Sequence, residues 1–379
     1  MNKANPHLIV ASGGTGGHFF PALAIARRFR ERGGVVTFLV AGQHAEEQLQ
    51  AARQGDFPAW AMEAVRLPGR GVAAVTFPFR FGRSVWAARS RLRMLAPDLV
   101  LGMGSFAAVP ACLATRLLRV PLVLHEGNSY VGRANRFLSR WADVMAISLP
   151  LADERLFHCP QIRTGLPLRD DILAAAGQTT APAEFYREVG LTPGKATLLV
   201  FGGSQGAQFL NGLMAGVSAL LGDDVKRLQI LHLTGTDDNA GLIDAYAKAG
   251  LVASVRRADS HIENCYLAAG LVICRSGAST ISELALFGKP AILVPLPTAA
   301  EDHQTINARM LEKRAAARLL TQGQATPETV TRLLRDWLDA PAKWAELGTR
   351  IGEIASPNAT DAVADLLLQT VHAKGRKGP

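Results

Sequence analysis

The sequence predicts an α/β protein built from two doubly wound parallel-sheet domains. Short apolar runs alternate with helical stretches along all 379 residues, a pattern typical of strands joined by crossover helices. The series of strands restarts near residue 195, after a Gly-, Pro- and Thr-rich stretch at 177–194. A glycine-rich loop follows the first strand of each series. This length suits two domains, and these three observations place one strand series in each.

Five apolar runs are expected as strands in the first half, at 7–12, 35–40, 98–101, 121–125 and 143–147. Amphipathic segments lie between them. Of these, residues 21–32 are expected as a helix that begins at Pro21, and residues 85–95 as another.

The second half repeats the pattern, with strands expected at 197–201, 228–234, 253–257, 271–274 and 291–295. A hinge is expected near 164–167, ahead of this series. The tail from Pro341 is expected to be helical, with a break at Ser356-Pro357.

Composition excludes several classes of protein. Hydrophobic residues make up 48% and charged residues 19%, which excludes intrinsic disorder. The four cysteines lie far apart without a C-x-x-C pair, so no zinc ribbon or disulfide framework is expected, and a reducing cytosol fits. The first residues do not resemble a signal peptide, and Gly, Pro or polar residues interrupt the apolar runs 99–115 and 196–222. No transmembrane helix is therefore expected.

The excess of positive over negative charge lies entirely in the N-terminal part of the chain. Residues 1–163 carry a net +10 and residues 164–379 a net −1. A one-sided basic surface favours a polyanion, an anionic membrane or a phosphorylated substrate, although a merely solvated Arg-rich surface is the alternative. Because no nucleic-acid-binding motif accompanies the charge, nucleic acid is not a predicted partner.

Two glycine loops have the context of phosphate-binding loops. SGGTGGH at 12–18 and FGGSQGAQ at 201–208 each follow an expected strand and precede an expected helix. The free N–H groups and positive dipole of such a helix start attract phosphate, although a plain tight turn is the alternative. Neither loop matches a P-loop or a clean dinucleotide fingerprint.

Two further segments suit a nucleotide sugar. CRSGASTISE at 274–283 places Glu283 two turns into a helix, where its carboxylate could accept both hydroxyls of a ribose. PLPTAAEDHQTINA at 295–308 places His303 and Gln304 at a loop–helix junction that suits sugar hydroxyls. The alternatives are an ordinary surface glutamate and helix capping by Asp302.

Five motifs in order resemble one family. SGGTGGH, LHEGN at 124–128, GGSQGA at 202–207, RSGA…SE at 275–283 and DHQ…NA at 302–308 together are similar to the MurG family, the N-acetylglucosaminyltransferases that act on a lipid-linked muramoyl-pentapeptide in peptidoglycan synthesis. The resemblance runs from about residue 7 to the C-terminal helices. It departs from the family pattern at Ser105, Gly127 and Leu166, and the 262–274 segment is about three residues short.

The resemblance implies a GT-B fold, in which two Rossmann-like domains face a cleft. The acceptor and membrane-side domain would be residues 1–163 with the C-terminal helix at about 356–379. The donor domain would be residues 164–355.

The implied reaction transfers GlcNAc from UDP-GlcNAc to the C4 hydroxyl of MurNAc in undecaprenyl-pyrophosphoryl-MurNAc-pentapeptide, with inversion. His18 is implied as the general base, with binding of the acceptor as its alternative role. No cofactor and no metal are implied, and the chain contains no D-x-D motif.

The remaining site residues follow from the same motifs. The implied donor-binding residues are Thr15, Gly16, Gly17, Arg169, Ser204, Gln205, Gly206, Ile262, Ala278, Ser279, Thr280, Glu283, His303 and Gln304. The implied acceptor-binding residues are Gly14, Gly104, His125, Glu126 and Asn128.

An aromatic and arginine-rich segment at 75–93 is the expected membrane contact. Its proposed contact residues, all expected to be exposed, are Phe79, Arg80, Phe81, Arg83 and Trp86. We therefore expect a peripheral protein on the cytoplasmic face of the inner membrane. The alternative is an ordinary amphipathic helix whose aromatic residues lie in the core.

Three other functions remain open from sequence. Another GT-B lipid or macrolide-type glycosyltransferase would share the donor half, whereas a UDP-sugar 2-epimerase would need several carboxylates for proton abstraction. A non-catalytic binding module would need neither half-site to be complete.

Overall fold

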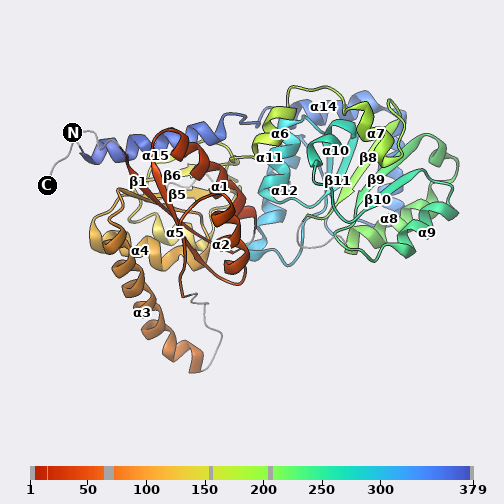
Figure 1. Cartoon of the computed structure of the whole chain (residues 1–379). Coiled ribbons are helices and arrows are strands. Elements are labelled where there is room, and N and C mark those ends of the chain that lie inside the picture. Colours follow the sequence, from red (N-terminus) through yellow and green to blue (C-terminus); the bar gives the residue numbers. More distant parts are fainter. Residues whose placement is uncertain (1–4, 15, 64–71, 153–156, 204–207, 376–379) are drawn as a thin grey trace. The chain divides into compact units, whose positions relative to one another are not determined.

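The computed structural model describes residues 5–14, 16–63, 72–152, 157–203 and 208–375. The chain divides into two compact units (Figure 1). Unit 1 contains residues 1–169 and 356–379, and unit 2 contains residues 170–355. The division from sequence was placed six residues earlier, between 163 and 164.

Unit 1 is built on a seven-stranded parallel sheet in the order β3-β2-β1-β4-β5-β6-β7. The strands are β1 His7–Gly13, β2 Val35–Ala41, β3 Ala59–Ala61, β4 Leu99–Gly102, β5 Leu122–Glu126, β6 Val144–Ile147 and β7 Gln161–Arg163. The helices are α1 Gly16–Glu31, α2 Ala45–Gln54, α3 Val72–Leu95, η1 Phe106–Ala108, α4 Val109–Leu118, α5 Arg133–Leu138 and α15 Ala359–Gly375.

Unit 2 is built on a six-stranded parallel sheet in the order β10-β9-β8-β11-β12-β13. The strands are β8 Ala196–Phe201, β9 Leu228–Leu233, β10 Ala253–Arg256, β11 Leu271–Cys274, β12 Ala291–Leu293 and β13 Arg318–Leu319. The helices are α6 Asp170–Ala175, α7 Ala183–Val189, α8 Gln208–Leu220, η2 Gly222–Lys226, α9 Ala240–Lys248, α10 Ile262–Ala268, α11 Ala278–Leu286, η3 Ala300–Asp302, α12 His303–Lys313, α13 Pro327–Asp339 and α14 Pro341–Gly352.

The predicted fold class is confirmed, and all ten expected strands are present within two residues of their expected ends. The sequence missed β3, β7 and β13, which are edge strands of two or three residues. Two expected helix starts were wrong. Helix α1 begins at Gly16 and passes through Pro21, and α3 begins at Val72 and passes through Pro78. Because helix propensity is a weak prior, one proline did not end either helix.

The two faces of the unit 1 sheet support separate apolar cores. Leu8 and Val10 of β1 pack with α1, whereas Ile9 and Ala11 pack with residues of α4 on the other face. Successive side chains of a strand point to opposite faces, so a continuous apolar strand contributes to both cores. The four cysteines are free and buried. No described helix is long and apolar enough to cross a membrane.

The C-terminal helix α15 is part of the unit 1 core. Its residues Val363 and Leu367 are fully buried against the same cluster as α1, and the two helices lie side by side in Figure 1. At the edge of this contact, Arg28 of α1 and Arg32, the residue after that helix, form ion pairs with Asp361 of α15. The apolar contact holds the helix that carries the first glycine loop against the end of the chain.

Leu367→Ala should lower the free energy of unfolding of unit 1 by about 2–5 kcal/mol, because it opens a cavity in the core. Asp361→Ala should cost less than about 1 kcal/mol, because its ion pairs are partly exposed to solvent. Urea unfolding followed by circular dichroism measures both variants. An equal or larger loss in Asp361→Ala would contradict the assignment of the stabilisation to apolar packing.

Candidate functional site

Each sheet has a switch point, which is the place where the crossover helices on its two sides begin to cover opposite faces. In open α/β sheets, ligands bind at this point, beyond the carboxyl ends of the strands. In unit 1 the switch point lies between β1 and β4, and in unit 2 between β8 and β11. Both glycine loops singled out from sequence leave the sheet at these two positions, after β1 and after β8.

Close packing requires glycine at the first positions of the first glycine loop. A Cβ atom on Gly13 would lie 2.2 Å from the carbonyl oxygen of Ala41, and Gly14 has a φ of +80°. No other residue fits the first position, and few adopt the second without strain. The side chain of Gln48, in α2, donates from Nε2 to the carbonyl oxygen of Gly14 at 2.9 Å, and this hydrogen bond helps to hold the turn.

His18 lies over this turn in the first part of α1. Its Cδ2 atom is 3.6 Å from the position that a Cβ on Gly14 would occupy, and its side chain is half-buried. Gly16 and Gly17 precede it at the start of the helix. Thr15 lies outside the described residues. The imidazole is therefore held beside exposed backbone N–H groups at the switch point of unit 1.

The second loop of unit 1 closes around Gly104, which has a φ of +84°. A Cβ atom there would lie 2.9 Å from Nδ2 of Asn135. Asn135 is fully buried and donates to the carbonyl oxygen of His125 and to Oε2 of Glu126, each at 3.0 Å. Asn135 is thus packed against Gly104 and hydrogen-bonded to the 125–126 segment.

Glu126 is a buried carboxylate that accepts hydrogen bonds from backbone N–H groups and side-chain amides. Its two oxygens accept hydrogen bonds from the backbone N–H groups of Asn128 and Gly132, from Nδ2 of Asn128 and from Nδ2 of Asn135, at 3.0–3.3 Å. Four donors satisfy most of the hydrogen-bonding capacity of a carboxylate. Glu126 therefore shapes the 126–132 loop, on which Asn128 is half-buried.

His125 points into the protein. It is buried, and its Nε2 lies 3.2 Å from Oγ of Ser148. Burial, with a smaller contribution from the nearby His18, lowers the pKa of His125 to about 3. His125 is therefore neutral at physiological pH. His125 therefore adds no positive charge near His18.

Two polar side chains at this site were missed from the sequence. Oε1 of Gln48 and Oγ of Ser105 are buried and have no hydrogen-bond partner among the described residues. Ser105 lies 3.1 Å from the Cβ position of Gly13. Buried polar atoms without partners are uncommon, and they mark places where a ligand or water completes the bonding. The departure of Ser105 from the family pattern was the available signal.

In unit 2, the described part of the glycine loop reaches Gly203 after β8. Ser204, Gln205 and Gly206, the expected pyrophosphate contacts, lie outside the described residues. The opposite side of the switch point is described. There Gly277 precedes α11, and Ala278, Ser279 and Thr280 form its half-buried first turn.

Glu283 follows on the next turn of α11. Its Oε2 atom accepts a 2.8 Å hydrogen bond from the hydroxyl of Tyr266 in α10, a partner that the sequence did not predict. Glu283 is half-buried, whereas Tyr266 is fully buried. The Tyr266 hydroxyl thus helps to hold the carboxylate, and the Glu283 side chain remains partly accessible.

Hydrogen bonds hold the 295–308 segment against Ser276, in the turn that follows β11. Oγ of Ser276 donates to the carbonyl oxygen of Gln304 at 2.8 Å, and Nδ2 of Asn307 donates to the carbonyl oxygen of Ser276 at 3.0 Å. The side-chain oxygen of Gln304 accepts from the N–H of Leu296, and Nδ1 of His303 lies 2.6 Å from the carbonyl oxygen of Ala300. His303 and Gln304, the two expected sugar contacts, therefore lie at the start of α12 in a segment held by these hydrogen bonds.

Asp302 occupies the position before α12 in a left-handed conformation with a φ of +54°. Its side chain makes no capping hydrogen bond, so the expected capping role was wrong. The left-handed backbone is the physical reason, because a capping side chain requires an extended conformation at this residue.

Arg275 is a buried guanidinium at the switch point of unit 2. It donates from Nη1 to the carbonyl oxygens of Val294 and Pro295, both at 3.0 Å, and it lies over the ring of Phe209 in α8. Burial lowers its pKa, but an arginine at this exposure stays charged. A fixed positive charge thus lies near the start of the helix that follows the glycine loop. Arg169, the other expected cation, is exposed and is the last residue of the first segment of unit 1.

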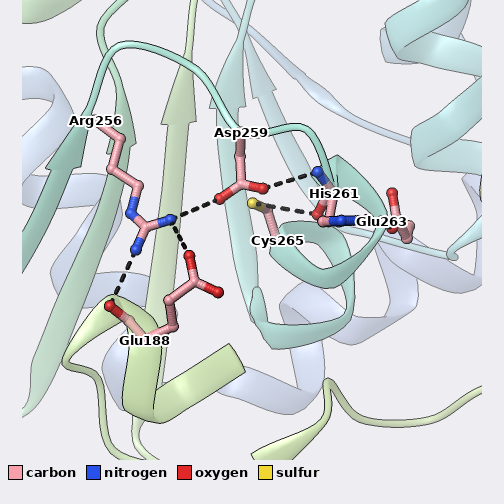
Figure 2. A network of polar contacts seen from close by, with 6 residues as sticks. All are labelled: Glu188, Arg256, Asp259, His261, Glu263 and Cys265. Atoms are coloured by element: carbon pink, nitrogen blue, oxygen red, sulfur yellow. Dashed lines mark hydrogen bonds and ion pairs between the residues drawn. The ribbon is translucent and has the colours of Figure 1, made fainter. Parts of the chain in front are cut away.

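A polar network supports the loop that leads into Ile262 (Figure 2). Arg256 donates to Oε1 of Glu188 at 2.7 Å and to Oδ2 of Asp259 at 3.2 Å. The other oxygen of Asp259 accepts from the N–H of His261, whose ring contacts Glu263. Ile262 is the half-buried first residue of α10. The sequence did not predict this network, which stabilises the shortened 262–274 segment. Among the residues that the structure describes, no cluster of three or more His, Cys, Asp or Glu side chains could hold a metal ion.

Two family models match the chain. The glycosyltransferase family 28 N-terminal domain matches residues 8–147, and the family 28 C-terminal domain matches residues 197–361. A crystal structure of a UDP-GlcNAc 2-epimerase from Neisseria meningitidis has a TM-score of 0.65 at 14% identity, covering 96% of this chain and 100% of that one, which shows a shared fold only.

Two further proteins are more similar to this chain in sequence. A protein of Chromohalobacter salexigens, named UDP-N-acetylglucosamine–N-acetylmuramyl-(pentapeptide) pyrophosphoryl-undecaprenol N-acetylglucosamine transferase, is 39% identical over 90% of this chain and 91% of its own length. A crystal structure of MurG from Acinetobacter baumannii is 30% identical, with a TM-score of 0.79 over 96% of this chain and 99% of that one. With similarity of this extent in both halves, the chain belongs to the MurG family of glycosyltransferases.

Proposed function

We propose that this protein transfers GlcNAc from UDP-GlcNAc to the C4 hydroxyl of MurNAc in a polyprenyl-pyrophosphoryl-MurNAc-pentapeptide, with inversion at the anomeric carbon. The observation that carries the proposal is the position of the family motifs at both switch points, where each unit offers glycine-loop backbone and polar side chains. The named activity of the family relatives supports the same reaction.

Unit 2 is the donor half in this proposal. Glu283 accepts the ribose hydroxyls, the start of α11 at Ala278–Thr280 and the loop at 204–206 hold the pyrophosphate, and His303 and Gln304 bind the GlcNAc hydroxyls. The buried charge of Arg275 adds to the positive potential near the glycine loop. Developing negative charge on the departing UDP is then stabilised by fixed dipoles and charges that need no reorganisation.

Unit 1 is the acceptor half, with His18 as the group that moves a proton. Its neutral imidazole takes the proton from the C4 hydroxyl as the oxygen attacks C1 of the sugar, and UDP departs from the opposite face. The neutrality of His125 matters here, because a charged neighbour would oppose the charge that His18 acquires. Gly14, Gly104 and Asn128 form the backbone and amide surface beside it.

The competing functions are less well supported. A 2-epimerase needs carboxylates that can take a proton from carbon, but Glu126 is buried and already accepts four hydrogen bonds. Another GT-B lipid glycosyltransferase would share the donor half, and only the acceptor distinguishes it.

The proposed function is tested by incubating the full chain with UDP-GlcNAc and a lipid-linked MurNAc-pentapeptide. We expect release of UDP that depends on the acceptor. Formation of UDP-ManNAc without an acceptor would instead show an epimerase, and transfer to a sugar other than MurNAc would show a different glycosyltransferase.

His18→Ala should lower kcat by about 10²–10⁴-fold, because a positioned general base contributes an effect of this size. The affinity for UDP, measured by calorimetry, should stay within about twofold of wild type, because His18 belongs to unit 1. A rise in the acceptor KM with an unchanged kcat would show instead that His18 only binds the acceptor.

We also propose that unit 1 binds an anionic membrane surface through helix α3, where the lipid-linked acceptor resides. Phe79 is 78% exposed and Trp86 is 63% exposed, and Arg80 is exposed between them. Isolated exposed apolar residues are ordinary, but large aromatic rings beside arginines on one helix favour insertion at a headgroup region. The net charge of +10 in residues 1–163 supports the same contact.

The expected exposure of Phe81 was wrong. Its ring is half-buried between Phe77 and Phe106, with centroid distances of 5.5 and 6.3 Å, and it packs against a core cluster of unit 1. Arg83 is exposed, but it pairs with Glu63 at 2.9 Å. The apolar face of an amphipathic helix takes Phe81 into the protein, so the proposed contact surface reduces to Phe79, Arg80 and Trp86.

The double substitution of Phe79 and Trp86 by Ser should reduce sedimentation with phosphatidylglycerol vesicles, and Arg80→Glu should reduce it by about tenfold at low salt. The matched control is Ile243→Ser, which removes an exposed apolar residue of unit 2. Activity on a short-chain soluble acceptor should survive in all three variants. Equal loss of activity on long-chain and short-chain acceptors would contradict a membrane role.

A further inference from the structure

Tyr266 has no assigned role, yet it donates a hydrogen bond to the Glu283 carboxylate. Its hydroxyl donates to Oε2 of Glu283 at 2.8 Å, and its side chain is fully buried. A tyrosine hydroxyl buried to this extent needs a partner, and losing it costs the desolvation of the group. The bond therefore constrains both residues.

The ring of Tyr266 is itself held on two sides. Phe287, just after α11, stacks on it with a centroid distance of 5.2 Å and an interplanar angle of 17°. Phe201, the last residue of β8, meets it edge-to-face at 6.0 Å. Aromatic contacts of both kinds favour one ring orientation. The hydroxyl consequently has little freedom to leave Glu283.

Tyr266 also connects three parts of the proposed donor site. It lies one helical turn after Ile262 on α10, so the two residues share a face of the helix. Its hydroxyl reaches α11, and its ring contacts the end of the strand that enters the glycine loop. Two of these elements carry residues expected to bind the nucleotide: Ile262 begins α10, and Glu283 lies on α11.

We infer that Tyr266 is a positioning residue for the nucleotide: it fixes the Glu283 carboxylate in the orientation that accepts the ribose hydroxyls. The inference rests on the proposed function. Glu283 is half-buried on a helix surface, where a glutamate would otherwise sample several rotamers, and binding would have to immobilise it. The hydrogen bond removes this cost before the nucleotide arrives.

The chemistry of Tyr266 suits this task and no proton transfer. Burial, and then the Glu283 charge beside it, raise the pKa of Tyr266 well above its usual value. The hydroxyl therefore remains a donor throughout the physiological pH range.

The test compares Tyr266→Phe with wild type, using calorimetry of the full chain with UDP and with 2′,3′-dideoxy-UDP. We expect Tyr266→Phe to weaken UDP binding by roughly tenfold and to leave binding of the dideoxy analogue within about twofold. In a Glu283→Ala background, Tyr266→Phe should change UDP affinity by less than about twofold, because the residue acts through Glu283.

Tyr246→Phe is the matched control. Tyr246 is also buried in unit 2, and its hydroxyl bonds Nδ1 of His232 at 2.7 Å, so the variant loses an equivalent buried hydrogen bond. It should leave UDP affinity unchanged within about twofold. Phe287→Leu is a second test that retains both partners of the Tyr266–Glu283 bond but loosens the ring. It should weaken UDP binding by about threefold, again without affecting the dideoxy analogue.

Equal weakening of both nucleotides by Tyr266→Phe, or a loss that persists in the Glu283→Ala background, would overturn the inference in favour of a purely structural role. If Tyr266→Phe does not fold, an unchanged ratio of the two affinities in Phe287→Leu overturns it equally. Failure of wild type to bind UDP would overturn the proposed function and this inference together. Normal UDP binding that depends on Glu283 and ignores Tyr266 would overturn the inference alone.

Discussion

The absence of a side chain at Gly13 is the constraint on which the unit 1 site depends. The chain leaves β1 so close to β2 that a methyl group there would overlap the carbonyl oxygen of Ala41. This close approach starts α1 at the switch point and places His18 over the turn rather than beyond it. The same helix is then held by α15 through buried apolar contacts. The packing of the last helix of the chain therefore supports the position of a residue near its start.

Unit 2 achieves its geometry by a different physical route. Its described switch point is braced by hydrogen bonds between side chains and backbone, from Ser276, Asn307 and Arg275. These groups are buried and almost fully paired, so the 295–304 turn can be held in a conformation with two residues at positive φ. Strained backbone persists only where its surroundings determine it. The polar network thus fixes the loop that presents His303 and Gln304.

The sequence predicted the parts of this fold that depend on local pattern. Continuous apolar strands and strand–glycine–helix transitions are local, and they sufficed for both sheets and both switch points. The sequence could not predict β13 or the Tyr266–Glu283 bond, because each depends on contacts between distant segments. Tyr266 looks like any core aromatic residue until its partner is known. Phe81 failed for a related reason: the amphipathic pattern left its burial as an alternative, and the contact with Phe106 on another element, which decides between them, is not local.

Glu126 and Glu283 show why a carboxylate cannot be assigned a role from its residue type or its motif. Both follow or flank a central strand, and both are partly or wholly withdrawn from water. Glu126 accepts hydrogen bonds from four donors, two of which are backbone N–H groups of one loop. These hydrogen bonds hold that loop in place. Glu283 is fixed from one side by Tyr266 and keeps its half-buried position on α11. The donors around Glu126 make it part of the framework of unit 1, whereas the Tyr266 hydrogen bond holds Glu283 on the same helix as the first-turn residues Ala278–Thr280.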